Sequence, residues 1–232
     1  MNKDFEFITE EAWFGAGLQK TGQESEKRSQ RHGAPWENRS ELGLWQGIFK
    51  TLKAALFSPK TLFSSLTFKG GIREPLAFGL LIGSIGGMFS FFWQFLMVSG
   101  GLFYFLQSIF GQVAMGMFFF IVLVIVPIFV TLALFLYSSI LHILLVIVRG
   151  GKNGYEATFR VVSYSQAAQA WSLIPFIGGF IGGIWQFIIQ IIGLRVIHET
   201  SYLRVILAFL IPVAFVFLLM FGTFIFLFIY IT

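Results

Sequence analysis

Long apolar stretches fill the chain from about residue 75 to its end, and charged residues are almost absent from them. A helix needs ~20 largely apolar residues to cross a membrane, because each residue advances it by about 1.5 Å. The pattern therefore predicts an all-α fold, an integral membrane helical bundle with five transmembrane helices. The predicted spans are about 75–98, 113–148, 157–175, 177–198 and 204–231.

The segment before the spans, residues 41–73, places apolar residues on one helical face, with lysines between them. Leu44, Ile48 and Leu52 belong to this face, and such a helix lies flat in the headgroup layer. The alternative is a helix packed on the cytoplasmic ends of the spans. The positive residues predicted to contact anionic lipid of the inner leaflet are Lys50, Lys53, Lys60, Lys69 and Arg73.

Residues 1–40 are polar and lack a helical apolar stripe, so we expect a disordered cytoplasmic tail. Scattered apolar residues in the tail indicate either a short partner-binding segment or loose contact with the membrane surface. The predicted organisation is a tail at 1–40, amphipathic interfacial helices at 41–73, and a five-span membrane domain at 74–232.

Glycines recur every fourth residue in the first and fourth spans. Missing side chains let helix backbones approach closely in a membrane, so this spacing predicts that these two spans pack directly against each other. The alternative is a pore lining. The residues of the predicted seam are Gly79, Gly83, Gly87, Gly178, Gly179, Gly182 and Gly183.

The third span carries hydroxyl and amide groups, so it must face protein or water rather than lipid. These residues are Ser163, Tyr164, Gln166 and Gln169. They either line a polar cavity for a lipid headgroup or a small solute, or form hydrogen bonds between helices. Pro175, which precedes two of the glycines, is a candidate hinge between the third and fourth spans.

The formal net charge is +5, and the positive residues cluster before the first span and near residues 149–160 and 195–204. Five crossings place all of them on the side of the N-terminus, which the positive-inside rule assigns to the cytoplasm, and put the C-terminus on the opposite side. Topology thus accounts for the charge, and no nucleic-acid partner is expected. The uncharged, apolar 99–112 connection is expected to rest in the outer interface.

Few residues suit catalysis or metal binding. The chain has no cysteine, no Asp or Glu within a predicted span, and no hydrolase, metalloprotease or phosphate-loop motif. His142 and His198 are expected near each other at the cytoplasmic ends of their spans, but two histidines without a carboxylate make a poor metal site. We therefore expect no enzyme activity, no cofactor and no metal.

Short motifs spread over about residues 35–215 share one resemblance. They are Pro35-Trp36-Glu37, Phe49-x-Thr51, Pro59-x-x-x-Phe63, Pro75-Leu76, Tyr164-Ser165, Ile174-Pro175-x-x-Gly178-Gly179, Trp185, Gly193-Leu194 and His198. Together they resemble the YIP (Ypt/Rab-interacting protein) family of five-span membrane proteins, particularly its small prokaryotic members. The resemblance implies a cytoplasmic N-terminus, five spans, a C-terminus on the opposite side and residence in a prokaryotic cytoplasmic membrane.

Eukaryotic proteins of that family act in vesicle traffic and bind prenylated Ypt/Rab GTPases and one another. The Asp-Leu-Tyr-Gly-Pro motif of many eukaryotic N-termini is missing here, so GTPase binding is not predicted for this chain. The cysteine-bearing zinc module that precedes Pro-Trp-Glu in many prokaryotic relatives is missing too.

Three hypotheses of function remain open. The first is a non-enzymatic membrane protein, a scaffold or adaptor, that organises membrane or partner proteins, including copies of itself. The second is a small transporter or lipid-translocating protein whose route passes the polar face of the third span. The third is an accessory subunit of a larger complex.

Overall fold

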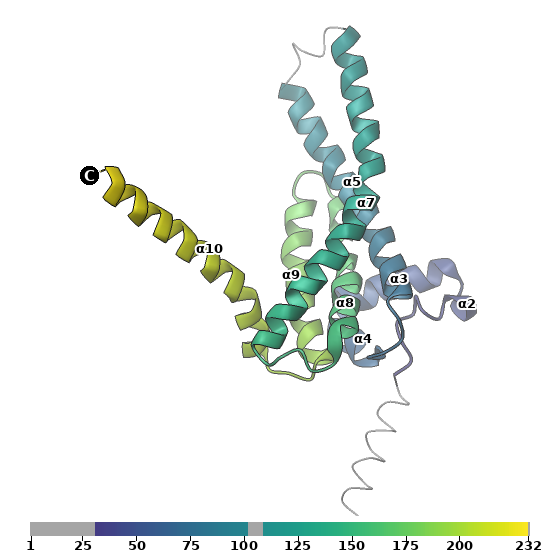
Figure 1. Cartoon of the computed structure of the whole chain (residues 1–232). Helices are drawn as coiled ribbons and strands as arrows, with labels where there is room; N and C mark the ends of the chain where they lie inside the picture. Colours follow the sequence, from purple (N-terminus) through teal and green to yellow (C-terminus); the bar gives the residue numbers. More distant parts are fainter. Residues whose placement is uncertain (1–30, 102–108, 232) are drawn as a thin grey trace, which may run out of the picture.

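The computed structural model describes residues 31–101 and 109–231, and every regular element in these two ranges is a helix (Figure 1). The predicted all-helical class is therefore confirmed. The predictions for residues 1–30 of the tail, and for residues 102–108 of the outer connection, concern positions outside the described residues.

Four of these helices are long and apolar enough to cross a membrane. They are α5 (Arg73–Gly101), α7 (Ile109–Ile147), α9 (Gly178–Ile197) and α10 (Tyr202–Ile231). Helix α7 contains Pro127 and changes direction about midway along its length (Figure 1). This bend agrees with the backbone hydrogen bond that a proline removes inside a helix.

The third predicted span differs from a single α-helix. It consists of α8 (Gly154–Ser165) followed directly by η1, a 3-10 helix (Gln166–Leu173). At the junction, Ser165 Oγ donates a hydrogen bond to the carbonyl of Val162, three residues earlier, at 2.7 Å. Such a bond competes with the regular helical pattern. Because of its polar side chains and its change of helix type, this segment is not one continuous apolar helix long enough to cross a membrane.

Element η1 lies between α5 and α9, so the predicted direct pairing of these two helices along their glycines is wrong. A Cβ added to Gly79 would come within 3.1 Å of Ser163, and one added to Gly182 within 2.9 Å of the Ala168 carbonyl oxygen. Ala168 is itself small and fully buried. Gly79 and Gly182 therefore let both long helices approach the α8–η1 segment, and Gly179 alone of the predicted seam faces the other long helix.

The other glycines of the predicted seam have different neighbours. A Cβ on Gly83 would meet Gln166 and Val130 at 3.1 Å, and one on Gly87 would meet Val126 of α7 at 3.2 Å. Gly178 lies against the Trp171 carbonyl of η1, Gly179 faces Ser90 of α5, and Gly183 has open space around it. Gly183 therefore plays no part in the packing between helices.

Three short helices precede the bundle: α2 (Arg39–Leu42), α3 (Leu44–Phe57) and α4 (Pro59–Ser65). Helix α3 buries one face, which includes Ile48, Thr51 and Ala55, against the bundle. A second apolar face is exposed, with Trp45 at 70% and Phe49 at 63%. The sequence predicted one apolar face on this helix, whereas the structure has two: one packs on the bundle and the other is exposed.

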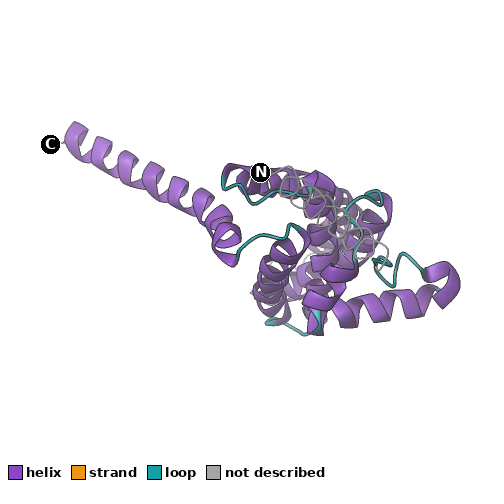
Figure 2. Ribbon diagram, turned by 90° about the horizontal axis from the view of Figure 1, so that it is seen from below, coloured by secondary structure: helices purple, strands orange, loops and turns teal. Residues whose placement is uncertain are grey.

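Helix α10 leaves the bundle at an angle, as the views from the front and from below both show (Figures 1 and 2). Near its start, Val205 and Ala208 are fully buried. The ring of Phe209 packs edge-on against that of Phe187, with 4.8 Å between the ring centroids. Beyond Pro212 its described side chains are exposed. Among the described residues, the first turns of α10 therefore hold it to the bundle.

Candidate functional site

A polar cleft of about 400 Å³ lies between α7, α8 with η1, and α9. Its polar lining residues are Tyr137, Gln166, Gln186 and Gln190. Of the four polar residues predicted for the third span, only Gln166 lines this cleft. The side chain of Gln166 makes no hydrogen bond with another described residue, so its amide can bind the contents of the cleft.

Gln190 is held rigidly beside the cleft. Its Oε1 accepts a hydrogen bond from the Tyr137 hydroxyl at 2.7 Å, and its Nε2 donates to Ser165 Oγ at 3.1 Å. The bonds connect α7, α8 and α9 through groups that would otherwise be unpaired in an apolar interior. The amides of Gln186 and Gln190 in the cleft wall therefore have hydrogen-bond partners, whereas the Gln166 amide has none among the described residues.

The other predicted polar residues serve packing. Gln169 Nε2 donates to Gln186 Oε1 at 2.6 Å and ties η1 to α9, which matches the alternative of hydrogen bonding between helices. The Ser163 hydroxyl is buried and has no hydrogen-bond partner among the described residues. Pro175 lies in the turn before α9, where its carbonyl accepts a bond from the Ile177 N–H, and its role as a hinge stays a prediction.

A buried arginine forms a second polar cluster, which sequence reasoning missed. The Arg160 side chain is fully buried in α8, and its Nη1 lies 3.0 Å from Glu37 Oε1, 123 residues earlier in the chain. Its Nη2 donates to the Gly71 carbonyl at 2.9 Å. The Tyr164 hydroxyl donates to the same Glu37 oxygen at 2.6 Å. Glu37, itself partly exposed, is thus a counter-charge of the buried Arg160.

Glu156 completes this cluster from the other side. Its Oε1 lies 3.5 Å from Arg160 Nε and accepts hydrogen bonds from the backbone N–H groups of Gly70 and Gly71, both at 2.6 Å. A side chain at Gly70 would collide with the Arg160 guanidinium. The loop before α5 therefore wraps closely around the buried charge, with its backbone as a hydrogen-bonding partner.

Trp36 holds the segment that carries Glu37 in place. Its backbone N–H donates to Thr51 Oγ1 of α3 at 2.8 Å, and its indole N–H donates to the Glu74 carbonyl of α5 at 3.0 Å. Arg39 pairs with the Glu74 carboxylate, and this hydrogen bond raises the pKa of Arg39. Residues 31–40, predicted as the end of the tail, are therefore packed against the bundle.

The signal for this cluster in the sequence is Pro35-Trp36-Glu37 itself, a large aromatic residue beside a carboxylate in a polar stretch. We use the name N-terminal latch for residues 35–39. Breaking one partner of a buried ion pair leaves an uncompensated charge, which typically costs 3–5 kcal/mol. The N-terminal latch therefore couples the surface helices to the bundle strongly.

The two histidines lie near each other, as predicted. Thr158 Oγ1 lies 2.8 Å from His198 Nε2 and 2.9 Å from His142 Nδ1, and it bridges the two rings. His198 Nδ1 accepts a hydrogen bond from the Asn153 N–H, so a neutral His198 carries its proton on Nε2. Burial, together with the nearby His142, lowers the pKa of His198 to about 4.

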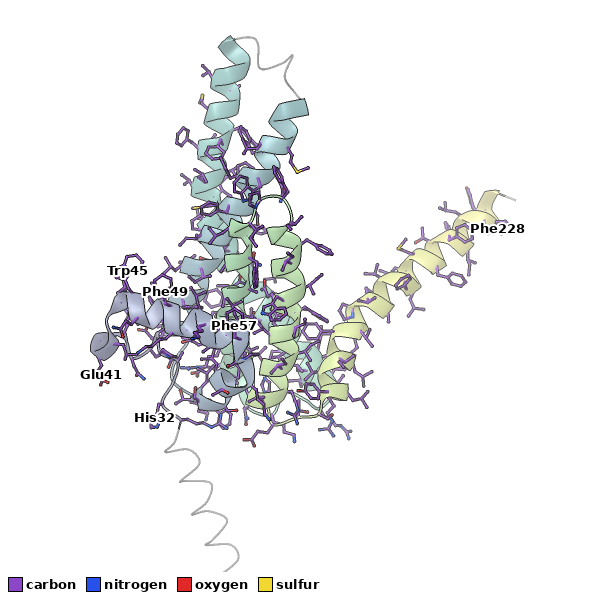
Figure 3. The ribbon with its side chains drawn as sticks, turned by 180° about the vertical axis from the view of Figure 1, so that it is seen from behind. His32, Glu41, Trp45, Phe49, Phe57 and Phe228 are labelled. Carbon is purple, nitrogen blue, oxygen red and sulfur yellow. The ribbon has the colours of Figure 1, made fainter. Side chains whose placement is uncertain are left out.

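The predicted lipid-contacting cations are all exposed at the surface. They occupy α3 (Lys50 and Lys53), α4 (Lys60), the following loop (Lys69) and the first residue of α5 (Arg73). The exposed aromatic face of α3 points the same way as the far ends of α5 and α7, whereas Glu41 lies on the opposite side (Figure 3). With its exposed aromatic face and its lysines, α3 thus resembles a helix that lies in a membrane interface.

Comparison with known proteins gives one family. The Yip1 domain matches residues 53–224, which include α4, α5, α7, α8, η1, α9 and most of α10. The match also includes the cleft and the buried Arg160. No curated protein and no solved structure matches the chain.

Proposed function

The chain belongs to the Yip1 domain family, and on this premise we propose that it is a non-enzymatic membrane protein that organises membrane or partner proteins. The observation that carries the proposal is the N-terminal latch. Through Glu37 and Arg160 it fixes α3, with its exposed aromatic face and lysines, to the membrane helices. Such rigid coupling suits a protein that acts through the position of its surface on a leaflet.

The topology that we propose has five crossings, with the N-terminus in the cytoplasm. The fifth crossing is α8 with η1, whose 12 and 8 residues together extend roughly 34 Å. This length is comparable with the ~30 Å hydrocarbon core of a bilayer. A reporter fused after residue 232 should then be active only on the non-cytoplasmic side. A cytoplasmic signal would contradict the odd number of crossings.

The organising role supposes that α3 rests on anionic lipid. Trp45 and Phe49 provide the apolar contact, and Lys50 and Lys53 provide the charge. Native mass spectrometry of gently solubilised complexes should find the chain with further copies or with other membrane proteins. The Trp45→Ser/Phe49→Ser variant should lose these complexes, whereas Gln166→Leu should keep them. Complexes that survive the first variant unchanged would contradict a role for α3.

The polar cleft favours a second candidate function, movement of lipid or a small solute. Gln166 is the amide that makes no hydrogen bond with a described residue, and it faces an opening of about 400 Å³. Under this candidate, reconstituted vesicles show flux above empty vesicles, and Gln166→Leu abolishes it. Under the organising role, vesicles with and without the protein have the same flux. The flux assay therefore separates the two functions.

A further inference from the structure

A basic groove of about 740 Å³ lies where α4 meets the C-terminal end of α9. Its charged lining residues are Arg31, Lys60, Arg195 and Glu199. It is separate from the polar cleft, with which it shares no lining residue. Three cations face one carboxylate, so the lining carries an excess of positive charge.

Two of these cations lack a charge partner among the residues that the structure describes. Glu199 pairs with Arg31 at 3.3 Å. Lys60 and Arg195 form no ion pair with any described carboxylate, and the Arg195 guanidinium instead stacks over the Tyr202 ring at 4.5 Å. Stacking fixes the direction of the guanidinium and leaves its N–H groups available. The groove thus presents one oriented guanidinium and one mobile ammonium to an anion.

One neutral hydroxyl, that of Thr200, supplements the charges. Ser64 and Ser65 also line the groove, but each hydroxyl already donates its proton to a backbone carbonyl and so offers no donor to an anion. The Oγ1 of Thr200 is buried and has no hydrogen-bond partner among the described residues. A buried hydroxyl without a partner costs about 1–3 kcal/mol, and an anionic oxygen would satisfy it. The Thr200 hydroxyl is therefore a second observation that points to an anionic ligand, independent of the charges.

We propose that this groove binds a phosphate group through Lys60, Arg195 and Thr200. An arginine fork, a lysine and a hydroxyl donor are the groups that recognise phosphate oxygens. The phosphate comes either from a lipid headgroup or from a soluble phosphate compound, because the groove lies at the end of the bundle near the exposed lysines. The organising role does not require this site.

The experiment uses the full-length protein in phosphatidylcholine nanodiscs. One arm adds phosphatidic acid to the nanodiscs and counts bound lipid by native mass spectrometry. The other arm titrates inorganic phosphate and glycerol phosphate calorimetrically. Saturable binding in the lipid arm alone assigns a headgroup, and binding in the soluble arm assigns a free phosphate. Absence of binding in both arms overturns the proposal.

Variants test the residues. Lys60→Gln/Arg195→Gln should weaken binding by about tenfold or more, since hydrogen bonds to charged groups are strong. Thr200→Val should weaken it by about threefold. The matched control, Arg149→Gln/Arg204→Gln, removes the same charge from exposed positions outside the groove and should stay within about twofold. Equal losses in both double variants would mean a general cationic surface and would overturn the site. Thermal unfolding of each variant checks that the fold is kept.

Discussion

The membrane helices of this protein fall into two groups that differ in burial. In an 18-residue apolar stretch of each helix, 33% of the residues are buried in α5 and in α9, compared with 6% in α7 and 11% in α10. The first pair carries the glycines and, with η1 between them, the amide network. The first half of α7 and most of α10 are apolar on nearly every face, whereas the C-terminal half of α7 carries Tyr137, Ser138 and His142. Burial here follows small and polar residues rather than hydropathy.

The physical reason lies in the solvent. Lipid tails are as apolar as leucine, so the hydrophobic effect does not drive two apolar helices together inside a bilayer. Close packing and hydrogen bonds do, and both need glycines or polar side chains. Helices α5, α8, η1 and α9 supply these and form the packed bundle. Helix α7 joins it through its C-terminal half, where Leu134, Ser138 and Leu141 are buried, whereas the first half of α7 and most of α10 supply mostly surface for lipid.

The largest expected effect concerns the charge in the packed bundle. Glu37→Gln removes the nearer of the two carboxylates beside the buried Arg160, and Glu156 at 3.5 Å compensates only part of the charge, so the free energy of unfolding should fall by about 3 kcal/mol. Thermal unfolding in detergent measures the loss. Glu41→Gln is the control, because Glu41 is exposed on α2 and its change should be within about 0.5 kcal/mol. Equal effects would show that the ion pair does not hold the N-terminal latch.

A pH effect follows from His198. An unfolded histidine titrates near 6.5, whereas burial lowers the pKa of His198 to about 4 in the fold. Between these values the unfolded chain binds a proton that the folded chain does not. Stability should therefore fall by up to about 3 kcal/mol as the pH drops from about 6.5 to 4. Unfolding measured along this range tests the sign and the size.

Two variants isolate the contribution of His198. His198→Asn should flatten the pH dependence over this range, because the titrating group is gone. His32→Asn should leave it intact, because His32 is exposed. A pH dependence that persists in His198→Asn would assign the effect to another group.

Adjacent glycines of α9 test the packing against η1. A Cβ at Gly182 would lie 2.9 Å from the Ala168 carbonyl oxygen, whereas one at Gly183 meets nothing within 4 Å. Gly182→Ala should therefore lower the free energy of unfolding by about 1–3 kcal/mol, as overpacking does. Gly183→Ala should leave it unchanged or raise it slightly. A reversal of this order in thermal unfolding would place η1 elsewhere.

The apolar helices and the proximity of His142 and His198 could be predicted from the sequence. Both depend on the length, hydropathy and ends of single segments, which can be read without knowing how the segments pack. The position of η1 depends on three segments at once, so glycine spacing alone pointed to the wrong partner. Glu37 and Arg160 each look like an ordinary surface charge in the sequence. Their pairing across 123 residues is a property of the fold alone.

The smallest expected effect is on α10. Leu218 is 71% exposed in the structure, so in a membrane its side chain contacts lipid both before and after α10 docks. Leu218→Ala should change the free energy of unfolding by less than about 0.5 kcal/mol. Leu194→Ala in α9 is the matched change at a fully buried site, and it should cost about 2 kcal/mol or more through lost packing. A large loss from Leu218→Ala would mean that α10 packs against protein in the membrane, and the contrast between the two groups of helices would then fail.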